Sequence, residues 1–332
     1  MSIISFFNHK GGVGKTTIVF NVGLALADAG HRILFIDADA QANLTGTALH
    51  AEAYQEIIDA DNTIIGALRP VIDGIGTVRD IDPVEIRENA WLVPGSIDLS
   101  DYEAILPTAW TGALAGQYQG FAQTTAMAKM ITQVSNDINA DFVLIDVGPS
   151  VGALNRVTLL GSDGFVLPLA PDLFSLTALP SVGKSLAMWV QDWSVAVGSA
   201  RRSGVYDRLP DDIFKGSPVP LGYISQQFAS YRSAPAAAFQ RWMDQIPDAY
   251  QRDVVDRLRN LDIETPDSEG LIGTIRNLSS LVPMAQETNR AIFELSGQVA
   301  RGSQYTKARD TKEDFMQLGQ QIISRLDEVS LT

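Results

Sequence analysis

The sequence contains no cysteine, and this absence excludes several classes of protein. Without thiols the chain can have neither a disulfide scaffold nor a thiolate metal site. Iron–sulfur chemistry is excluded for the same reason. Histidine is also scarce, with three residues (His9, His31 and His50), which argues against a histidine-based zinc site.

Long apolar runs are missing as well. No stretch approaches the roughly 20 uncharged apolar residues that span a bilayer. The first ten residues, MSIISFFNHK, have neither a basic leader nor a cleavage site, so we expect no signal peptide. Hydrophobic residues make up 45% and charged residues 19% of the chain, the balance of a globular protein. We therefore expect a cytoplasmic protein that does not enter a membrane.

Basic residues are scarce: 25 lysines and arginines stand against 39 aspartates and glutamates, and the formal net charge is −14. The balance is −11 for residues 1–165 and −3 for residues 166–332. A uniformly acidic surface repels DNA, so contact with nucleic acid would need a local basic patch, which the second half could best supply. The simpler interpretation is that these charges form an ordinary solvated surface.

The first fifty residues have the pattern of a β–α–β unit. SIISFFN (2–8) is a short apolar strand, and the residues after the next glycine loop, 16–30, have apolar side chains at helical spacing up to Gly30. RILFIDAD (32–39) is a continuous apolar strand that ends in two aspartates. Continuous apolar strands that alternate with helices indicate a parallel sheet covered on both faces. We predict an α/β fold of three layers, with a mostly parallel twisted sheet flanked by helices on both faces, in one domain over 1–332.

The remaining segments extend this pattern. Further strands are predicted at 141–148, 164–170, 219–225 and 270–276, and helices at 98–109, 120–138, 175–197, 236–261, 284–297 and 303–328. Segment 51–90 contains Pro70, Gly74, Gly76 and Pro83 and is interpreted as a surface excursion. Residues 198–218 are predicted to form a long loop.

The glycine-rich loop between the first strand and its helix indicates a phosphate site. In this setting a glycine turn and a helix N-terminus aim backbone N–H groups at phosphate oxygens. Lys15 is expected to reach the β- and γ-phosphates, and the hydroxyl of Thr16 to ligate Mg²⁺. A chance glycine turn is the alternative. The residues of the predicted loop are Gly11, Gly12, Val13, Gly14, Lys15, Thr16 and Thr17.

KGGVGKTT (10–17) resembles the deviant Walker A box of the ParA/MinD family of P-loop ATPases. His9 stands where the general pattern has its first glycine, and Lys10 stands at the family's signature lysine. The resemblance implies that Lys10 contacts the nucleotide of the opposite subunit in an ATP-sandwich homodimer. A cation supplied in trans would then stabilise charge during phosphoryl transfer, as an arginine finger does. The alternative for Lys10 is an ordinary exposed lysine.

LFIDADAQANLT (34–45) resembles the family's switch I, with Ala40 in place of the usual proline. The resemblance implies that Asp39 orients or activates the attacking water. A carboxylate suits that position, because in-line attack on the γ-phosphate depends mostly on positioning. Asp37 orients Thr16 or the water shell of the metal, or it is structural.

DFVLIDVGPS (141–150) resembles the family's Walker B strand and switch II, with Gly148 replacing the first of two prolines. This places Asp146 at the carboxyl end of a strand, where it is expected to hold Mg²⁺ through water. Residues 91–106, 168–182 and 283–295 also resemble the family, and the loop with Pro283 lies near the adenine in relatives. The resemblance is weak in 51–90 and 190–265. No guanine-reading N-K-x-D motif is present, which favours ATP over GTP.

The resemblance implies a nucleotide switch of the ParA type, closer to partition ATPases than to MinD. Mg-ATP would drive dimerisation, and slow hydrolysis stimulated by a partner protein would reset the dimer. Such proteins position plasmids, chromosomes or other cargo, and many bind DNA non-specifically. The candidate DNA-binding residues are Arg201, Arg202, Arg208, Lys215, Arg252, Arg257 and Arg259.

Other functions stay open at this point. One is an ATP-dependent regulatory or assembly component that never touches DNA, which the net acidity favours. Another is a metabolic relative such as an amidoligase, although nothing in the sequence suggests its substrate site. A MinD-like membrane role would need a basic amphipathic C-terminal helix. The polar face of 311–332 is acidic, so we expect Phe315, Leu318, Ile322 and Leu326 to pack on the domain instead.

Overall fold

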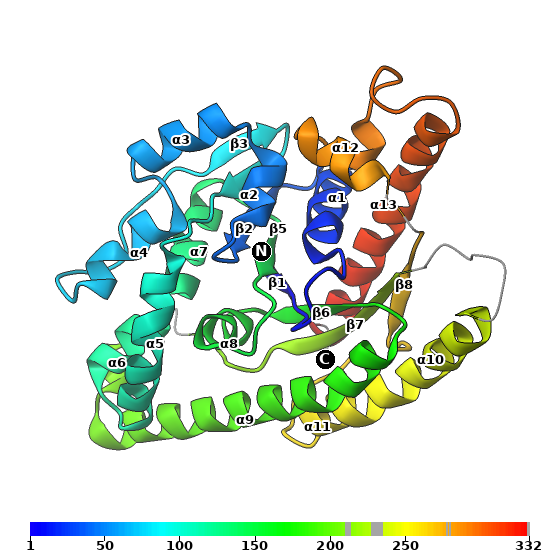
Figure 1. Cartoon of the computed structure of the whole chain (residues 1–332). Helices are drawn as coiled ribbons and strands as arrows, with labels where there is room; N and C mark the ends of the chain where they lie inside the picture. The colour runs from blue at the N-terminus through cyan, green and yellow to red at the C-terminus, as the bar shows by residue number, and fades with distance from the viewer. Residues whose placement is uncertain (210–213, 227–234, 277, 279, 331–332) are drawn as a thin grey trace.

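The structure is a computed structural model, and it describes residues 1–209, 214–226, 235–276, 278 and 280–330 (Figure 1). Within these residues eight strands form one sheet in the order β3-β4-β2-β5-β1-β6-β7-β8. Only β3 runs antiparallel to its neighbour; the other six strand pairs are parallel. The predicted α/β class is confirmed. The strands are β1 Ser2–Phe6, β2 Ile33–Ala38, β3 Val84–Arg87, β4 Ala90–Val93, β5 Phe142–Val147, β6 Gly164–Leu169, β7 Val219–Gln226 and β8 Leu271–Ile275.

Helices cover both faces of this sheet (Figure 1). One apolar layer lies under α4 to α9 together with the π-helical turn η2 and α11, and the other lies under α1, α2, α12, η3 and α13. The helices of the first half are α1 Lys15–Asp28, α2 Asn43–Ala48, α3 Ala51–Asp59, α4 Ile64–Ile72, α5 Leu99–Leu114, α6 Tyr118–Thr124, α7 Ala126–Asp137 and α8 Ala153–Leu160. Those of the second half are α9 Leu173–Ser203, η1 Tyr206–Arg208, α10 Pro235–Tyr250, η2 Gln251–Val255, α11 Asp256–Arg259, α12 Leu281–Glu287, η3 Ile292–Glu294 and α13 Ser303–Ser330.

Strand order and register bring the predicted site residues to one edge of the sheet. β1, the strand before the glycine loop, lies between β5 and β6, and β2 pairs with the other side of β5. In the β2–β5 pair, Asp37 and Asp146 lie directly side by side. Because the carboxyl ends of parallel strands meet at one edge, the loops after β1, β2 and β5 converge there.

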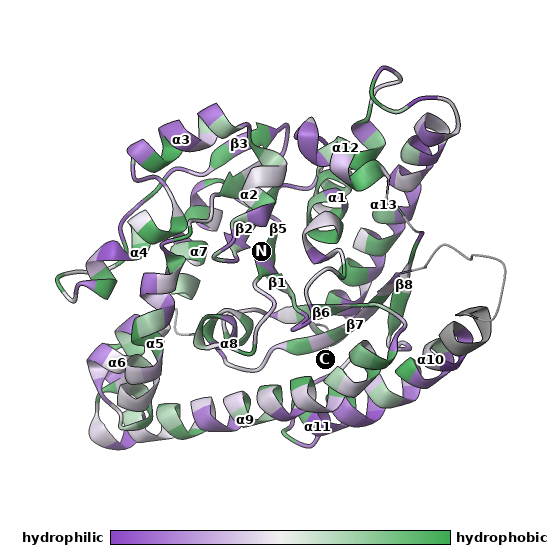
Figure 2. Cartoon of the chain, in the orientation of Figure 1, coloured by the Kyte–Doolittle hydropathy of each residue, from purple (hydrophilic) through white to green (hydrophobic). Residues whose placement is uncertain are grey.

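The C-terminal helix α13 packs on the domain, as predicted. Phe315, Leu318, Ile322 and Leu326 are buried in the layer shared with α1. Figure 2 shows α13 with hydrophobic and hydrophilic residues interspersed, as a helix with one buried face should have. Arg325 is buried on the same helix, and its guanidinium donates at 2.7 Å to the carbonyl oxygens of Leu221 and Leu271, which ties α13 to β7 and β8.

Helix α9 is unusually long and apolar. It has 31 residues and reaches a mean hydropathy of 1.2 over an 18-residue window, which by length and composition alone is enough to cross a membrane. It is the one helix of the described chain that reaches this value, and core helices of soluble proteins do so too. On its inner face Trp193 stacks on Trp110 of α5 and on Phe214, at centroid distances of 5.8 and 4.3 Å.

The interpretation of 51–90 as a surface excursion is wrong for much of the segment. Ile64, Ile65 and Leu68 are buried in the core through α4, and residues 84–87 and 90–93 form two strands. Helix α4 continues through Pro70, one of the residues on which that interpretation rested. Pro70 stands in the last turn of α4, where its missing N–H deprives the carbonyl oxygen of Gly66 of the usual helical donor.

Other element boundaries also differ from the sequence predictions. Helix α9 begins at Leu173 and continues past 197 to Ser203, ending at Gly204 with φ of 69°. Segment 198–218 is therefore a loop only in its later part, and its residues 210–213 lie outside the described chain, as do 227–234 of the divergent 190–265 segment. The single helix predicted at 284–297 is two short pieces, α12 and η3. Asn289, with φ of 49°, separates them.

Candidate nucleotide site

The glycine loop has the geometry of a phosphate cradle. Gly12 and Gly14 have φ of 76° and 67°, in the left-handed region that favours glycine. Within the described chain the N–H groups of Gly11, Gly12, Val13 and Gly14 donate to no other protein group. Lys15 begins α1, so the positive end of the helix dipole points to the same place. These features fit a bound phosphate chain.

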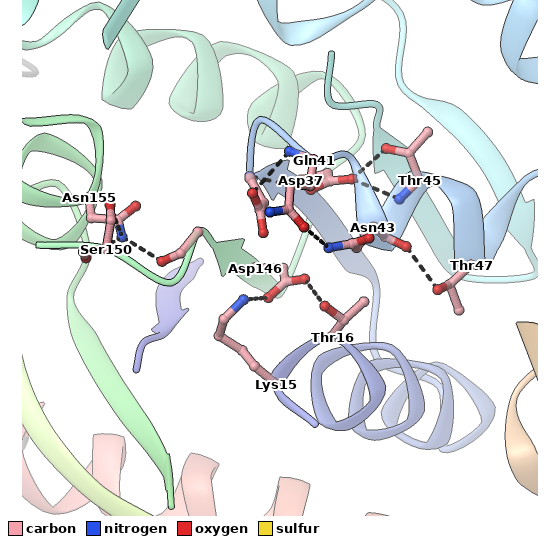
Figure 3. A network of polar contacts seen from close by, with 12 residues as sticks. Lys15, Thr16, Asp37, Gln41, Asn43, Thr45, Thr47, Asp146, Ser150 and Asn155 are labelled. Carbon is pink, nitrogen blue, oxygen red and sulfur yellow. Dashed lines mark hydrogen bonds and ion pairs between the residues drawn. The ribbon is translucent and has the colours of Figure 1, made fainter. Parts of the chain in front are cut away.

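Lys15 and Thr16 converge on the carboxylate of Asp146, as Figure 3 shows. The ammonium of Lys15 lies 2.5 Å from Oδ1, and the hydroxyl of Thr16 donates to Oδ2 at 2.6 Å. Lys15 is 7% exposed and Asp146 is fully buried. Burial raises the pKa of Asp146, and the charge and hydrogen bond of Lys15 oppose this rise. The three side chains predicted to hold phosphate and metal thus lie in contact.

Asp37 lies next to this cluster and is also buried. Its Oδ2 accepts hydrogen bonds from the backbone N–H and the hydroxyl of Thr45, both at 2.7 Å. Burial and repulsion from Asp146 raise the pKa of Asp37 to about 7, although the bonds from Thr45 oppose the rise. Asp37 therefore ties β2 to α2. Within the described chain no hydrogen bond joins it to Thr16, whose orientation was one of its possible roles.

These oxygens fit Mg²⁺. This ion prefers one or two carboxylates, waters and the substrate's phosphates. Within the described residues no group of three or more histidine, cysteine or acidic side chains could hold a metal by itself. Thr16 and Asp146 would hold Mg²⁺, which would neutralise charge on the phosphates.

Asp39 is the first residue after β2. It is 5% exposed, and its Oδ1 accepts the backbone N–H of Gln41 at 3.0 Å. A Cβ placed on Gly148 would lie 3.4 Å from the same oxygen, so the loops after β2 and β5 meet at Asp39. Gly148, which replaces a proline of the family pattern, leaves space beside this carboxylate.

Lys10 points to α9 and away from Asp146. Its ammonium forms an ion pair with Asp172, the N-cap of α9, and lies 5.4 Å from the ring centroid of Phe174. Phe174 is 72% exposed. Asp172 also accepts the N–H of Ser175 at 2.8 Å, and these contacts hold its pKa below the usual value although burial acts to raise it. Lys10 is therefore separate from the Lys15 cluster.

Several residues of this region were not predicted from the sequence to take part in the site. Thr45 and Asp172 stand inside motifs that resemble the family, and Asn8 lies two residues before one, so their positions could have been noticed. Asn155 and Gln226 carry no local signal. Asn155 donates to the carbonyl oxygens of Gly148 and Ser150 at 2.6 and 2.7 Å and so fixes the loop after β5.

Pro283, predicted near the adenine, is exposed in the first turn of α12. Among the described residues no hydrogen bond joins it to the Lys15 cluster. Its segment is linked to α2 instead, because Asn289 donates to the carbonyl oxygens of Gly46 and Leu49 at 3.0 and 2.8 Å. The proposed adenine contact stays a prediction.

The charge of Asp37 provides a test of this electrostatic description. In the metal-free protein, the change Asp37→Asn keeps an oxygen acceptor for Thr45 and removes the buried charge. Because the folded pKa lies above the ordinary value of 3.8, ionised Asp37 costs stability above pH 7, and that cost disappears as the pH falls towards 4. We expect the variant to be more stable at pH 8 by up to about 4 kcal/mol, and nearly equal to the wild type at pH 4.

Urea unfolding at the two pH values measures this difference. Asp59→Asn, at an exposed acceptor of Gln55, is the matched control and should change little at either pH. Equal stability of the wild type and Asp37→Asn at pH 8 would contradict a buried charge at this position.

Comparison with known proteins agrees with this geometry. A family model described as an AAA domain matches residues 1–192, more than half of the chain. The sporulation initiation inhibitor protein Soj of Bacillus subtilis is 31% identical over 179 residues, which cover 53% of this chain and 61% of Soj. The chain therefore belongs to the AAA-domain family that this model defines, within the ParA/MinD group of P-loop ATPases.

Solved structures extend the similarity beyond the matched segment. Protein DIP2308 of Corynebacterium diphtheriae has a TM-score of 0.70 and 26% identity, over 87% of this chain and 97% of that chain. The ATP complex of a McdA variant from Cyanothece has a TM-score of 0.58 and 19% identity, over 96% of both chains, which shows the shared fold. The chain spans between 42% and 62% of the length of the first curated relatives that it matches.

Proposed function

We propose that this protein is a nucleotide-dependent switch that binds Mg-ATP, dimerises around it and hydrolyses it slowly. The observation that carries the proposal is the contact of Lys15 and Thr16 with Asp146, beside a loop whose residues 11–14 donate no backbone N–H to any group of the described chain. In this arrangement Lys15 and the loop bind the β- and γ-phosphates. The loop residues from Gly11 to Thr17 form the cofactor-binding set, and Thr16 and Asp146 hold the metal.

Hydrolysis would depend on Asp39. Water attacks the γ-phosphorus, the bond to the β–γ bridging oxygen breaks, and ADP and phosphate leave with the displaced proton. Asp39 orients the attacking water, which is the main requirement of such an in-line displacement. Its Oδ1 is held by the N–H of Gln41, so the carboxylate is pre-oriented. As the resemblance to the ParA/MinD family implies, we expect slow turnover that a partner protein accelerates.

Lys10 would couple ATP binding to dimerisation. In the single chain its ammonium is paired with Asp172, so it does not serve its own phosphate site. In a dimer it would instead reach the nucleotide of the second copy and stabilise charge there. Both Lys10 and Asp172 are about 30% exposed, with values of 31% and 27%, and exposed ion pairs contribute only about 0–1 kcal/mol. Lys10 can therefore leave Asp172 and contact a phosphate at little cost in free energy.

The cellular role that we propose is partition of DNA or positioning of another cargo. A relative supports this role: the chromosome partitioning protein ParA of Caulobacter vibrioides is 28% identical over 190 residues. The alternative is a regulatory or assembly component that does not bind DNA, and the formal net charge of −14 favours it. Arg252 is paired with Asp253, Arg201 lies over the ring of Tyr206, and Arg208 over that of Tyr118. Of these three arginines Arg252 has a carboxylate partner, whereas the ring contacts leave the charges of Arg201 and Arg208 in place.

A phosphate-release assay with Mg-ATP tests the proposed activity, and gel filtration with ATP or ADP tests the switch. We expect slow release of phosphate that stops with EDTA, and a dimer with ATP but not with ADP. A protein that binds neither nucleotide would contradict the proposal. DNA binding at two salt concentrations separates the two roles, because a phosphate-dominated contact weakens steeply with salt.

A further inference from the structure

Gln226, the last residue of β7, contacts the phosphate loop across 213 residues of sequence. Its Nε2 donates a hydrogen bond to the carbonyl oxygen of Val13 at 2.5 Å. The side chain is half-buried, and none of the roles described above uses it. Strand β7 is not next to β1 in the sheet, so this contact reaches over the end of β6.

The contact is unusually close because Gly14 has no side chain. A Cβ placed on Gly14 would lie 2.1 Å from Nε2 of Gln226, well inside the distance that real atoms tolerate. The amide of Gln226 therefore occupies the space directly over the α-carbon of Gly14. Glycine is required there for this approach as well as for its φ of 67°.

A second amide holds the loop at its start. Asn8 donates to the carbonyl oxygen of Pro168 at 2.6 Å and accepts the N–H of Lys10 at 2.9 Å. Pro168 lies in β6. The loop is thus fixed at its first residues to β6 and at the Val13–Gly14 peptide to β7.

We infer that Gln226 is a positioning residue for the phosphate loop, a role that rests on the nucleotide binding proposed above. A trans peptide is planar, with its C=O and N–H pointing in opposite directions. Because Gln226 holds the carbonyl oxygen of Val13 on one side, the N–H of Gly14 in the same peptide unit points to the other. Gln226 therefore keeps that N–H available as a phosphate donor and opposes rotation of the peptide. It acts through the loop, without touching the nucleotide.

Calorimetric titration with three probes tests this role: Mg-ATP, Mg-GTP and magnesium tripolyphosphate. For Gln226→Ala we expect the affinity for each probe that the wild type binds to fall by a similar factor, about 5- to 30-fold, the range for a lost hydrogen bond that orders a binding group. Gln240→Ala is the matched control. Gln240 is exposed on α10, and its amide donates to Asp244 at 2.8 Å.

A second variant separates positioning from a merely structural effect. In Gln226→Glu a carboxylate would face the carbonyl oxygen of Val13, so binding relative to the wild type should be weakest at pH 8. A protonated carboxyl can donate the missing hydrogen bond, so the difference from the wild type should shrink as the pH is lowered to 5. A variant whose fold is simply damaged would show no such recovery.

The outcomes are distinguishable. Unchanged affinity in Gln226→Ala, or a Gln226→Glu defect that is the same at pH 5 and pH 8, would overturn the inference. A loss confined to one nucleotide, with tripolyphosphate unaffected, would also overturn it, because Gln226 would then read the base. If the wild type binds none of the three probes, the proposed function itself fails.

Discussion

Replacing Lys15 by alanine is expected to weaken nucleotide binding, with an affinity for Mg-ATP about 10- to 150-fold below that of the wild type. A charge-assisted hydrogen bond contributes about 1.5–3 kcal/mol, and the lost phosphate contact is of this kind. The lysine is buried and has the carboxylate of Asp146 as its partner at 2.5 Å. Calorimetric titration with Mg-ATP measures the effect.

The same change also affects folding, and this must be separated from binding. Removal of Lys15 leaves Asp146 buried without its cation, and breaking a buried pair typically costs about 3–5 kcal/mol. The double variant Lys15→Ala with Asp146→Asn removes both charges. We expect it to recover most of the free energy of unfolding and none of the binding. Lys129→Ala, at an exposed lysine of α7 that contacts Thr77, is the control. Wild-type affinity in the stable double variant would contradict the assigned site.

Replacing Lys10 by alanine is expected to have a different result: Mg-ATP still binds, but the ATP-dependent dimer is lost. The reason is that Lys10 pairs with Asp172 at α9 and makes no contact with Asp146 or Lys15. A cation that serves the phosphates of a second copy contributes to assembly and not to binding by the single chain. We expect the dimer dissociation constant with ATP to rise at least about 100-fold, if the charge is desolvated in the dimer. Analytical ultracentrifugation measures it.

Two further variants make this test specific. Asp39→Ala should bind ATP and remain dimeric, because the water that attacks the γ-phosphate is no longer oriented. Asp172→Asn removes the cis partner of Lys10, so its dimer should be as strong as that of the wild type or up to about 5-fold stronger, given the small contribution of an exposed ion pair. Dimerisation that depends on neither ATP nor Lys10 would show that the switch proposal is wrong.

The similarity of Lys15 and Lys10 in the sequence conceals how differently they are placed. They lie five positions apart, and both stand in one glycine loop. The structure directs one to β5 and the other to α9, because the loop turns between them through Gly12 and Gly14. The prediction of two distinct roles came from a resemblance, and their separation in space supports it without testing either role.

The sequence by itself determined the parts of this protein that depend on local pattern. Continuous apolar runs predicted β1, β2, β5 and β6, and the glycine spacing predicted the phosphate loop, because strand burial and left-handed turns leave a trace in neighbouring residues. The same local reasoning failed in 51–90. There Pro70 and the glycines signalled a break, and only packing against the core shows that Ile64 and Leu68 belong to a buried helix.

The tertiary structure alone decided which residues far apart in the chain come into contact. Lys15 meets Asp146 over 131 residues, Lys10 meets Asp172 over 162, and Gln226 meets Val13 over 213. Such pairs depend on strand order and register, which no single segment encodes. The side-by-side placement of Asp37 and Asp146, for example, follows from the pairing of β2 with β5. Local pattern thus specifies which elements form, and the packing of the whole chain decides which side chains meet.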